Sequence, residues 1–227
     1  MRTLPFIALR SGCLTDLGRS GETSAEVLAD ITSLINQALD FAYPWQHRGW
    51  PELTKASSET ITSQVIDRDA VGSGLFGVIR VLRVTRNHPH TATNPEPLDY
   101  QETAAGIVVQ DSAPPATAYV EHIEAPPIFD GTAWVTSTAY VVGDVRVNGV
   151  EAYYCATAHT AGTFATDLAA DKWVVVPFPA FLQTPVRAAV VAAMRGAGAQ
   201  DQTRLSLLQS LLETHLSAVA LRYEQQR

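Results

Sequence analysis

The chain has 227 residues, of which 46% are hydrophobic, enough to build the core of one ordinary domain or two small ones. This composition excludes a chain that is disordered throughout. Sixteen Lys and Arg against 23 Asp and Glu give a net charge of −7, which disfavours specific DNA recognition because neutralising phosphates needs clustered basic residues. Cys13 and Cys155 lie far apart and show no metal-ligand spacing, so neither a zinc site nor a disulfide scaffold is encoded.

The N-terminus begins with a short apolar run, residues 4–9. This run is too short for a signal peptide, and Arg10 interrupts it before any small-residue cleavage site. No stretch approaches the roughly 20 apolar residues needed to span a bilayer. The sequence therefore predicts a soluble protein made without a targeting signal.

The first predicted helix covers residues 24–42, approximately. Thr23 and Glu26 have the spacing of a capping box. Apolar residues then recur at steps of three and four and form one stripe, which ends before Pro44. The following segment, 43–51, contains Trp45 and Trp50 between two prolines. It is either a loop folded back onto the core or an exposed subunit contact.

Short β-like runs alternate with turn residues from about residue 59 to 129. The predicted strands are 60–66, 76–84, 106–109 and 118–123. The second run does not alternate strictly between polar and apolar residues, which indicates a strand buried on much of both faces or one at a subunit contact. Residues 87–90 and 94–97 have loop chemistry.

The end of the chain predicts a pair of helices. Thr184 and Pro185 form a good N-cap and first-turn pair, and Gly196 ends the helix that they begin. A second helix starts near Asp201, with leucines on one face. The expected fold class is α+β: a helical domain with an N-terminal helix and a C-terminal helix pair, a β-rich middle and a small inserted all-β module.

The inserted module is residues 130–176, which differ in texture from both flanks. Asn148-Gly149 between two Val-rich runs is the strongest hairpin pattern in the chain. Together with Trp134, Tyr140, Gly143-Asp144-Val145, a Tyr at 153 or 154 and the closing Trp173, it makes the segment resemble small β modules of the chitin-binding type, which are found on chitinases and on phage tail and connector proteins. The resemblance implies carbohydrate stacking on exposed rings, and it implies candidates by position: Trp134, Tyr140, Tyr154 and Trp173. The alternative for each ring is a place in the small core of the module.

The flanks, 1–129 and 177–227, read as one discontinuous domain once the module is removed. They resemble the head–tail adaptor (connector) proteins of tailed bacteriophages. The resemblance is carried by six segments and by the proline-led helix pair; the segments are 34–45, 50–53, 84–89, 97–100, 106–109 and 118–129.

This resemblance implies a ring, usually of twelve copies, that docks under the phage portal protein and contacts a tail or terminator (stopper) protein. DNA would pass through the ring without sequence-specific contacts, and the protein would be made in the host cytoplasm and located in the virion. An acidic chain suits a lumen because carboxylates repel phosphate; residues 1–128 hold 9 basic and 15 acidic residues. Relatives often insert a C-terminal segment into the portal, which makes Arg222, Tyr223, Gln225 and Arg227 candidate portal contacts; the alternative is a frayed helix end. Trp45 and Trp50 are candidate subunit contacts.

An enzyme is the least supported class. The sequence contains no nucleophile elbow, metalloprotease, P-loop or paired-carboxylate motif, so no catalytic residue, metal or cofactor is expected. The alternative to a connector is a carbohydrate-binding accessory protein, or a tail or receptor-binding protein, acting on chitin, cell-wall glycan or host surface glycan.

Overall fold

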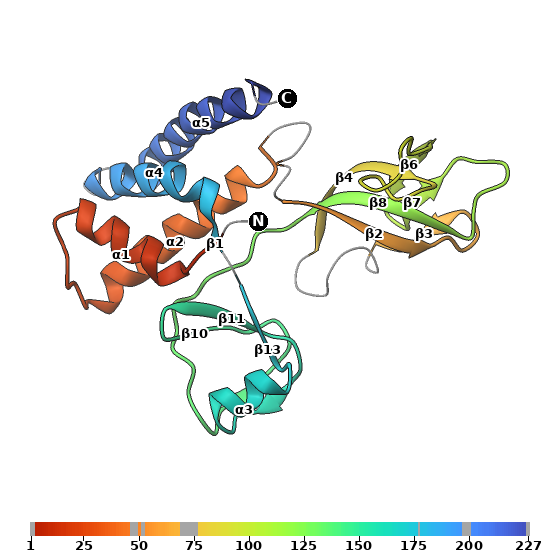
Figure 1. The fold of residues 1–227 in the computed structure, drawn as a ribbon. Helices are drawn as coiled ribbons and strands as arrows, with labels where there is room; N and C mark the ends of the chain where they lie inside the picture. Colours follow the sequence, from red (N-terminus) through yellow and green to blue (C-terminus); the bar gives the residue numbers. More distant parts are fainter. Residues whose placement is uncertain are drawn as a thin grey trace. The chain divides into compact units, whose positions relative to one another are not determined.

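The structure, a computed structural model, describes residues 3–45, 50, 53–68, 77–176, 178–196 and 201–225. It contains helices and largely antiparallel strands, which confirms the α+β class. The chain forms two compact units (Figure 1). The first comprises Met1–Ala42 and Pro127–Arg227, and the second comprises Tyr43–Pro126. We call them the helical unit and the sheet unit.

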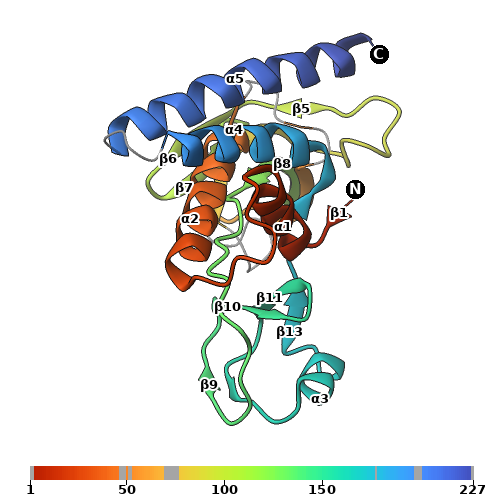
Figure 2. The same cartoon turned by 90° about the vertical axis from the view of Figure 1, so that its left-hand side faces the viewer.

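The helical unit joins the two ends of the chain in one core. Its long helices are α1 (Phe6–Asp16), α2 (Ala25–Ala42), α4 (Gln183–Arg195) and α5 (Asp201–Gln225). Helix α4 packs on α1, α2 and α5 (Figures 1 and 2). The core is aliphatic and contains Leu9, Ile31, Ile35, Val190 and Leu212. The helices are therefore stabilised by burying apolar faces that lie far apart in sequence.

Helix α2 confirms the predicted helix 24–42 within one residue, but the predicted capping box does not form. Glu22, and not Glu26, accepts hydrogen bonds from the backbone N–H groups of Thr23 and Ser24, at 3.0 and 2.8 Å. In a capping box the Glu26 carboxylate would accept from the Thr23 N–H. Here the Glu22 carboxylate, which precedes the helix, accepts from that N–H instead.

Helix α4 begins one residue before the predicted N-cap. A 3₁₀ turn, Ala180–Leu182, leads directly into Gln183, so Thr184 lies inside the first turn, and Leu182 holds the N-cap position without a side-chain cap. Gly196 follows the last helical residue, as predicted. Helix α5 then buries Leu208, Leu212 and Leu216, which confirms the predicted leucine face.

The segment 130–176 forms short elements within the helical unit: β9 (Ala139–Tyr140), β10 (Val145–Asn148), β11 (Glu151–Cys155), β12 (His159–Thr160), α3 (Phe164–Ala169) and β13 (Trp173–Val175). Strands β10, β11 and β13 form one antiparallel sheet, and β9 pairs with β12. Asn148 pairs with Glu151 across a two-residue loop, and Gly149 in that loop has φ of +64°. This hairpin was predicted, and glycine suits it because a positive φ costs glycine no Cβ clash.

Both ends of this segment are fixed to the N-terminal residues. Strand β1 (Thr3–Leu4) pairs antiparallel with β14 (Phe178–Pro179), which follows the segment. Phe129, which precedes it, stacks on Phe6 with ring centroids 4.3 Å apart. The chain therefore leaves and re-enters the helical core beside the same few residues.

The sheet unit contains two antiparallel sheets. Strands β2 (Thr54–Thr60), β8 (Thr117–Glu124), β4 (Val78–Thr85) and β5 (Pro97–Leu98) form the first, in that order. Strands β3 (Val65–Ile66), β7 (Gly106–Val109) and β6 (Tyr100–Thr103) form the second. An apolar cluster that includes Ile66, Val84, Ile107 and Val120 forms the core of this unit.

Strand β4 explains the irregular pattern of residues 76–84. Its pairing with β8 shifts register between Val78 and Arg80 and again between Val81 and Arg83. Each shift inserts one extra residue, Ile79 and Leu82, which reverses the inward and outward sense of the side chains that follow. Broken alternation here results from two bulges rather than from burial on both faces.

Three other features of the sheet unit differ from the predicted strands. The range 60–66 is split, because β2 ends at Thr60 and the two-residue β3 begins at Val65, with Ser63 and Gln64 at positive φ between them. Strands β5 and β6 were not predicted. Strand β7 occupies 106–109, as predicted.

The units also differ in extent from the predicted domains. The prediction grouped 1–129 with 177–227 and separated 130–176, whereas the compact units separate Tyr43–Pro126 from the remainder. The sheet unit is thus itself an insertion between α2 and the segment that carries Phe129.

Candidate functional site

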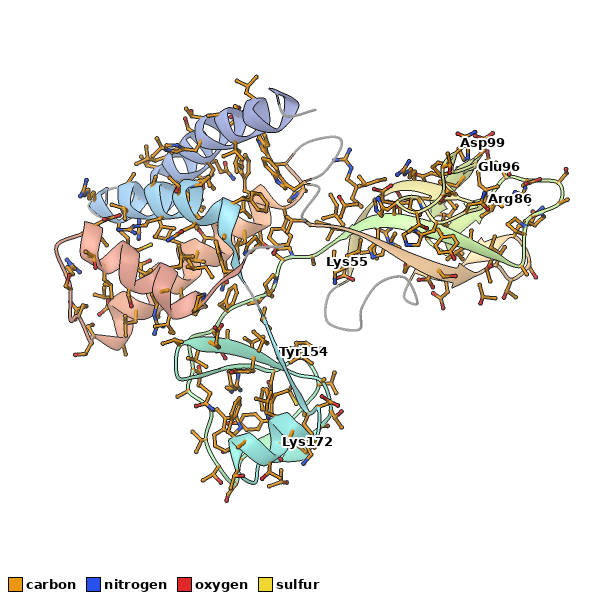
Figure 3. The ribbon with its side chains drawn as sticks, in the orientation of Figure 1. Lys55, Arg86, Glu96, Asp99, Tyr154 and Lys172 are labelled. Atoms are coloured by element: carbon orange, nitrogen blue, oxygen red, sulfur yellow. The ribbon has the colours of Figure 1, made fainter. Side chains whose placement is uncertain are left out.

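Three of the four aromatic residues proposed for sugar stacking lie in the interior. Tyr140, Tyr154 and Trp173 expose 3%, 6% and 2% of their surface, and Tyr154 is labelled on β11 in Figure 3. Tyr140 also donates its hydroxyl proton to the carbonyl of Val135, at 3.1 Å. A pyranose needs an open ring face, so these three residues take the core alternative that the sequence had left open.

Trp134 is half-buried and contacts other aromatic residues instead of standing alone. Its ring meets Phe164 edge to face, with centroids 5.4 Å apart, and Phe164 meets Tyr153 in the same way at 4.7 Å. Around Trp173 the rings of Tyr140 and His159 lie at 5.0 and 5.7 Å. These contacts give a segment of fewer than 50 residues a core made mostly of rings.

The outward apolar side chains of this segment are aliphatic. The large ones are all valines, each with at least 40% of its surface exposed: Val135, Val141, Val142, Val150, Val174 and Val175. The sequence had left each aromatic residue open to either a sugar platform or the core, and in the structure valines rather than aromatic rings face outward.

A cluster of polar residues that the sequence analysis did not propose lies beside the aromatic core. The Asp167 carboxylate accepts hydrogen bonds from Lys172 Nζ and the Gly162 N–H, both at 2.9 Å, and its Oδ2 lies 3.4 Å from His159 Nε2. The hydrogen bond from Lys172 lowers the pKa of Asp167 below its ordinary value. Lys172 is labelled beside α3 in Figure 3. No spacing in the sequence predicts this cluster, because its residues come together only when the loop 156–171 folds.

The same cluster brings a thiol near an imidazole, yet the thiol is not activated. Cys155 Sγ lies 3.9 Å from His159 Nδ1, whereas that nitrogen lies 2.7 Å from the carbonyl oxygen of Thr157. A carbonyl only accepts, so Nδ1 carries its proton toward Thr157 and is not a base for the thiol. Burial also raises the pKa of Cys155, which opposes formation of a thiolate. The cluster joins the loop to β13 and supplies no nucleophile.

The predicted subunit contacts Trp45 and Trp50 stack on each other, with centroids 5.8 Å apart and ring planes 15° from parallel. Trp50 exposes 1% of its surface, and Trp45 is half-buried. Trp50 therefore takes the folded-back alternative, while residues 46–49 and 51–52 lie outside the described part of the chain.

The predicted portal contacts lie at the end of α5. The backbone remains helical to Gln225, so Arg222, Tyr223 and Gln225 continue the helix, and a frayed end is not observed up to that residue. The side chains of 222–225 and all of Arg227 lie outside the described residues.

An open pocket of about 750 Å³ in the helical unit was not predicted. It lies where α1 and α4 end and where α2 and α5 begin, and it is lined by Leu17, Arg19, Glu26, Val27, Asp30, Met194, Arg195 and Arg204. Arg204 Nη2 pairs with Asp30 at 2.8 Å, and Arg195 Nη2 donates to the carbonyl of Asp16 at 2.7 Å. Three arginines converge on this pocket from three different segments, so periodicity could not have found it.

A third arginine contact joins helices α1 and α4. Arg187 on α4 forms a two-point ion pair with Asp16 at the end of α1. This pair lowers the pKa of Asp16 and raises that of Arg187. The ends of α1 and α4 are thereby fixed to each other.

The sheet unit carries an excess of acidic residues, whereas arginines outnumber carboxylates around the pocket of the helical unit. Residues 43–126 include ten acidic and six basic residues. At one end of the unit Arg86 contacts both Glu96, at 3.2 Å, and Asp111, at 2.7 Å, and Asp99 lies nearby (Figure 3). We call Glu96, Asp99 and Asp111 the acidic tip.

No protein-family model and no curated protein matches this chain. Among the described residues, no helix is both long and apolar enough to cross a membrane. The described part of the chain also contains no group of three or more His, Cys, Asp or Glu side chains placed to hold a metal ion.

Proposed function

We propose that this protein is a structural virion protein, a ring-forming head–tail adaptor that joins the phage portal to the tail and forms part of the DNA channel. The observation that carries the proposal is the helical unit. This unit contains α2 and the pair α4 and α5, which carry adaptor-like segments from the two ends of the chain. The three helices pack in one core, although 140 residues separate the end of α2 from the start of α4. The chain interrupts this core with β segments that do not disturb it.

The charge of the chain supports a conduit for DNA. A ring lumen must let the duplex slide, and carboxylates on its wall repel phosphate where lysine and arginine would hold it. The surplus of acidic residues in 1–128, fifteen against nine basic residues, provides such a wall.

Helix α5 supports contact with a portal protein. It has 25 residues, so it is about 38 Å long at 1.5 Å per residue. Its buried leucines attach it to the helical unit, and its last turns bring Arg222, Tyr223 and Gln225 to its far end. In the proposed function this end, with Arg227, reaches the portal.

The segment 130–176 is an accessory in this proposal. Its rings stabilise its own core, so a role as the functional centre through sugar stacking has little support. Its ends lie beside the same N-terminal residues, Leu4 and Phe6, so removing it need not separate the elements of the helical core.

The decisive measurement is the mass of the full-length protein in solution, with and without a portal protein. A closed ring of fixed copy number, formed alone or on the portal, is expected. Deleting 130–176 is expected to leave the ring intact. A monomer that ignores portal proteins and is retained on chitin or cell-wall glycan would overturn the proposal in favour of a carbohydrate-binding protein.

A further inference from the structure

The pocket in the helical unit is lined by three arginines and by two carboxylates, Glu26 and Asp30, so it has a formal excess of one positive charge. Arg204 is paired with Asp30. Arg19 and Arg195 form no ion pair among the described residues, and both are exposed. Each guanidinium has five N–H donors in a fixed fork, and Arg195 donates from Nη2 to the carbonyl of Asp16. The pocket therefore presents unused donors in a chain whose net charge is −7.

The acidic tip has the complementary excess. Arg86 is shared between Glu96 and Asp111, and Asp99 forms no ion pair among the described residues. The Glu96 side chain is 58% exposed, and Asp99 is also exposed. Three carboxylates against one guanidinium leave a formal charge of −2 on the acidic tip, where Arg86, Glu96 and Asp99 are labelled in Figure 3.

We propose that the pocket binds the acidic tip of a second copy of this chain, with Arg19 and Arg195 donating to the carboxylates of Asp99 and Glu96. The guanidinium fork matches a carboxylate at two points, which favours arginine over lysine in such contacts. Glu96 and Asp99 flank the two-residue strand β5, and the pocket volume of about 750 Å³ is ample for their two side chains. The proposed partner is a second copy because the tip and the pocket belong to the same sequence and their charges are opposite.

The contact also determines the kind of assembly. The pocket belongs to the helical unit and the tip to the sheet unit, so the two patches are different surfaces. Such a contact is heterologous, and repeated head to tail it builds a ring where the rotation between copies closes. The inference rests on the proposed ring and names the contact that would close it.

Two variants each reverse the charge on one side of the contact. The pocket variant carries Arg19→Glu and Arg195→Gln, and the tip variant carries Glu96→Gln and Asp99→Lys. All four residues are exposed, so both variants should keep the far-ultraviolet circular dichroism of the wild type. A third variant, Arg19→Lys, keeps the charge and removes the two-point geometry.

We expect each variant alone to need on the order of 100-fold more protein than the wild type for half-assembly, because like charges now meet. Mixing the pocket and tip variants one to one should restore assembly, since in an alternating ring every reversed pocket meets a reversed tip and every native pocket a native tip. Arg19→Lys should fall between wild type and pocket variant. Assembly of the wild type should also weaken as salt rises from 50 to 300 mM.

The readout is mass against protein concentration, by light scattering or native mass spectrometry. Variants that assemble like the wild type would overturn the contact while leaving the adaptor proposal standing. A further outcome would also overturn the inference. If the mixture did not assemble but a single chain carrying all four substitutions did, the contact would lie within one protomer. A wild type that forms no ring with or without the portal would overturn the adaptor proposal itself.

Discussion

Phe129 should be among the most important single side chains for the stability of the helical unit. It exposes 1% of its surface and stacks on Phe6 at 4.3 Å with ring planes 2° from parallel. The Asn36 amide also binds both backbone groups of Phe129, donating to its carbonyl at 2.6 Å and accepting from its N–H at 3.0 Å. Phe129→Ala removes the ring and leaves a cavity beside Phe6, which costs about 3–5 kcal/mol in the free energy of unfolding.

The assay is urea unfolding followed by circular dichroism at 222 nm, which reports this unit because α1, α2, α4 and α5 all belong to it. With a denaturant slope of about 2 kcal/mol per molar, the midpoint should fall by roughly 2 M. Ile128→Ala is the matched control: the neighbouring side chain is 69% exposed, so its loss should change stability by less than about 0.5 kcal/mol. A Phe129→Ala midpoint within 0.5 M, roughly, of the Ile128→Ala midpoint would refute the anchoring role.

Two further outcomes follow from the structure. Gly106→Ala should destabilise the sheet unit by at least about 2 kcal/mol, because Gly106 has φ of +132° and an added Cβ would lie 2.3 Å from the Ile66 carbonyl oxygen. The measurement is urea unfolding followed by tryptophan fluorescence. Gly18→Ala, at φ of +70° in open space, is the control and should cost less; equal losses of stability in the two variants would rule out the clash. Lys172→Met should reduce the dependence of folding stability on pH below about pH 4. The hydrogen bond from Lys172 is the largest cause of the lowered folded-state pKa of Asp167. The stabilisation by the Asp167 carboxylate is therefore complete above its unfolded pKa of about 3.9 and is lost as pH falls through its folded-state pKa. If the unfolding midpoint changed with pH equally in the wild type and in Lys172→Met between about pH 2.5 and 5, this assignment would be contradicted.

Local patterns in the sequence were enough to predict the elements that have one apolar stripe or one distinctive turn. Helix α2 and the leucine face of α5 follow from periodicity, and the β10–β11 hairpin follows from Asn148-Gly149. Helix α1 was missed because it has no single stripe: apolar residues such as Ile7 and Ala8 stand outside the buried set of Phe6, Leu9, Cys13 and Leu14. The bulges of β4 were also missed, since a register shift depends on the partner strand β8.

By itself the sequence determined composition, charge, the α+β class and the position of most helices, because these depend on residues that are near one another in the chain. Tertiary structure alone decided which surfaces face outward. Tyr140 and Trp173 have the size and polarity for either a sugar platform or a core, and only the folding of Phe164 and His159 around them places them inside. Arg19, Arg195 and Arg204 likewise meet because α1, α2, α4 and α5 pack together. Burial and charge convergence are properties of contacts between distant segments, and a pattern along one segment does not contain them.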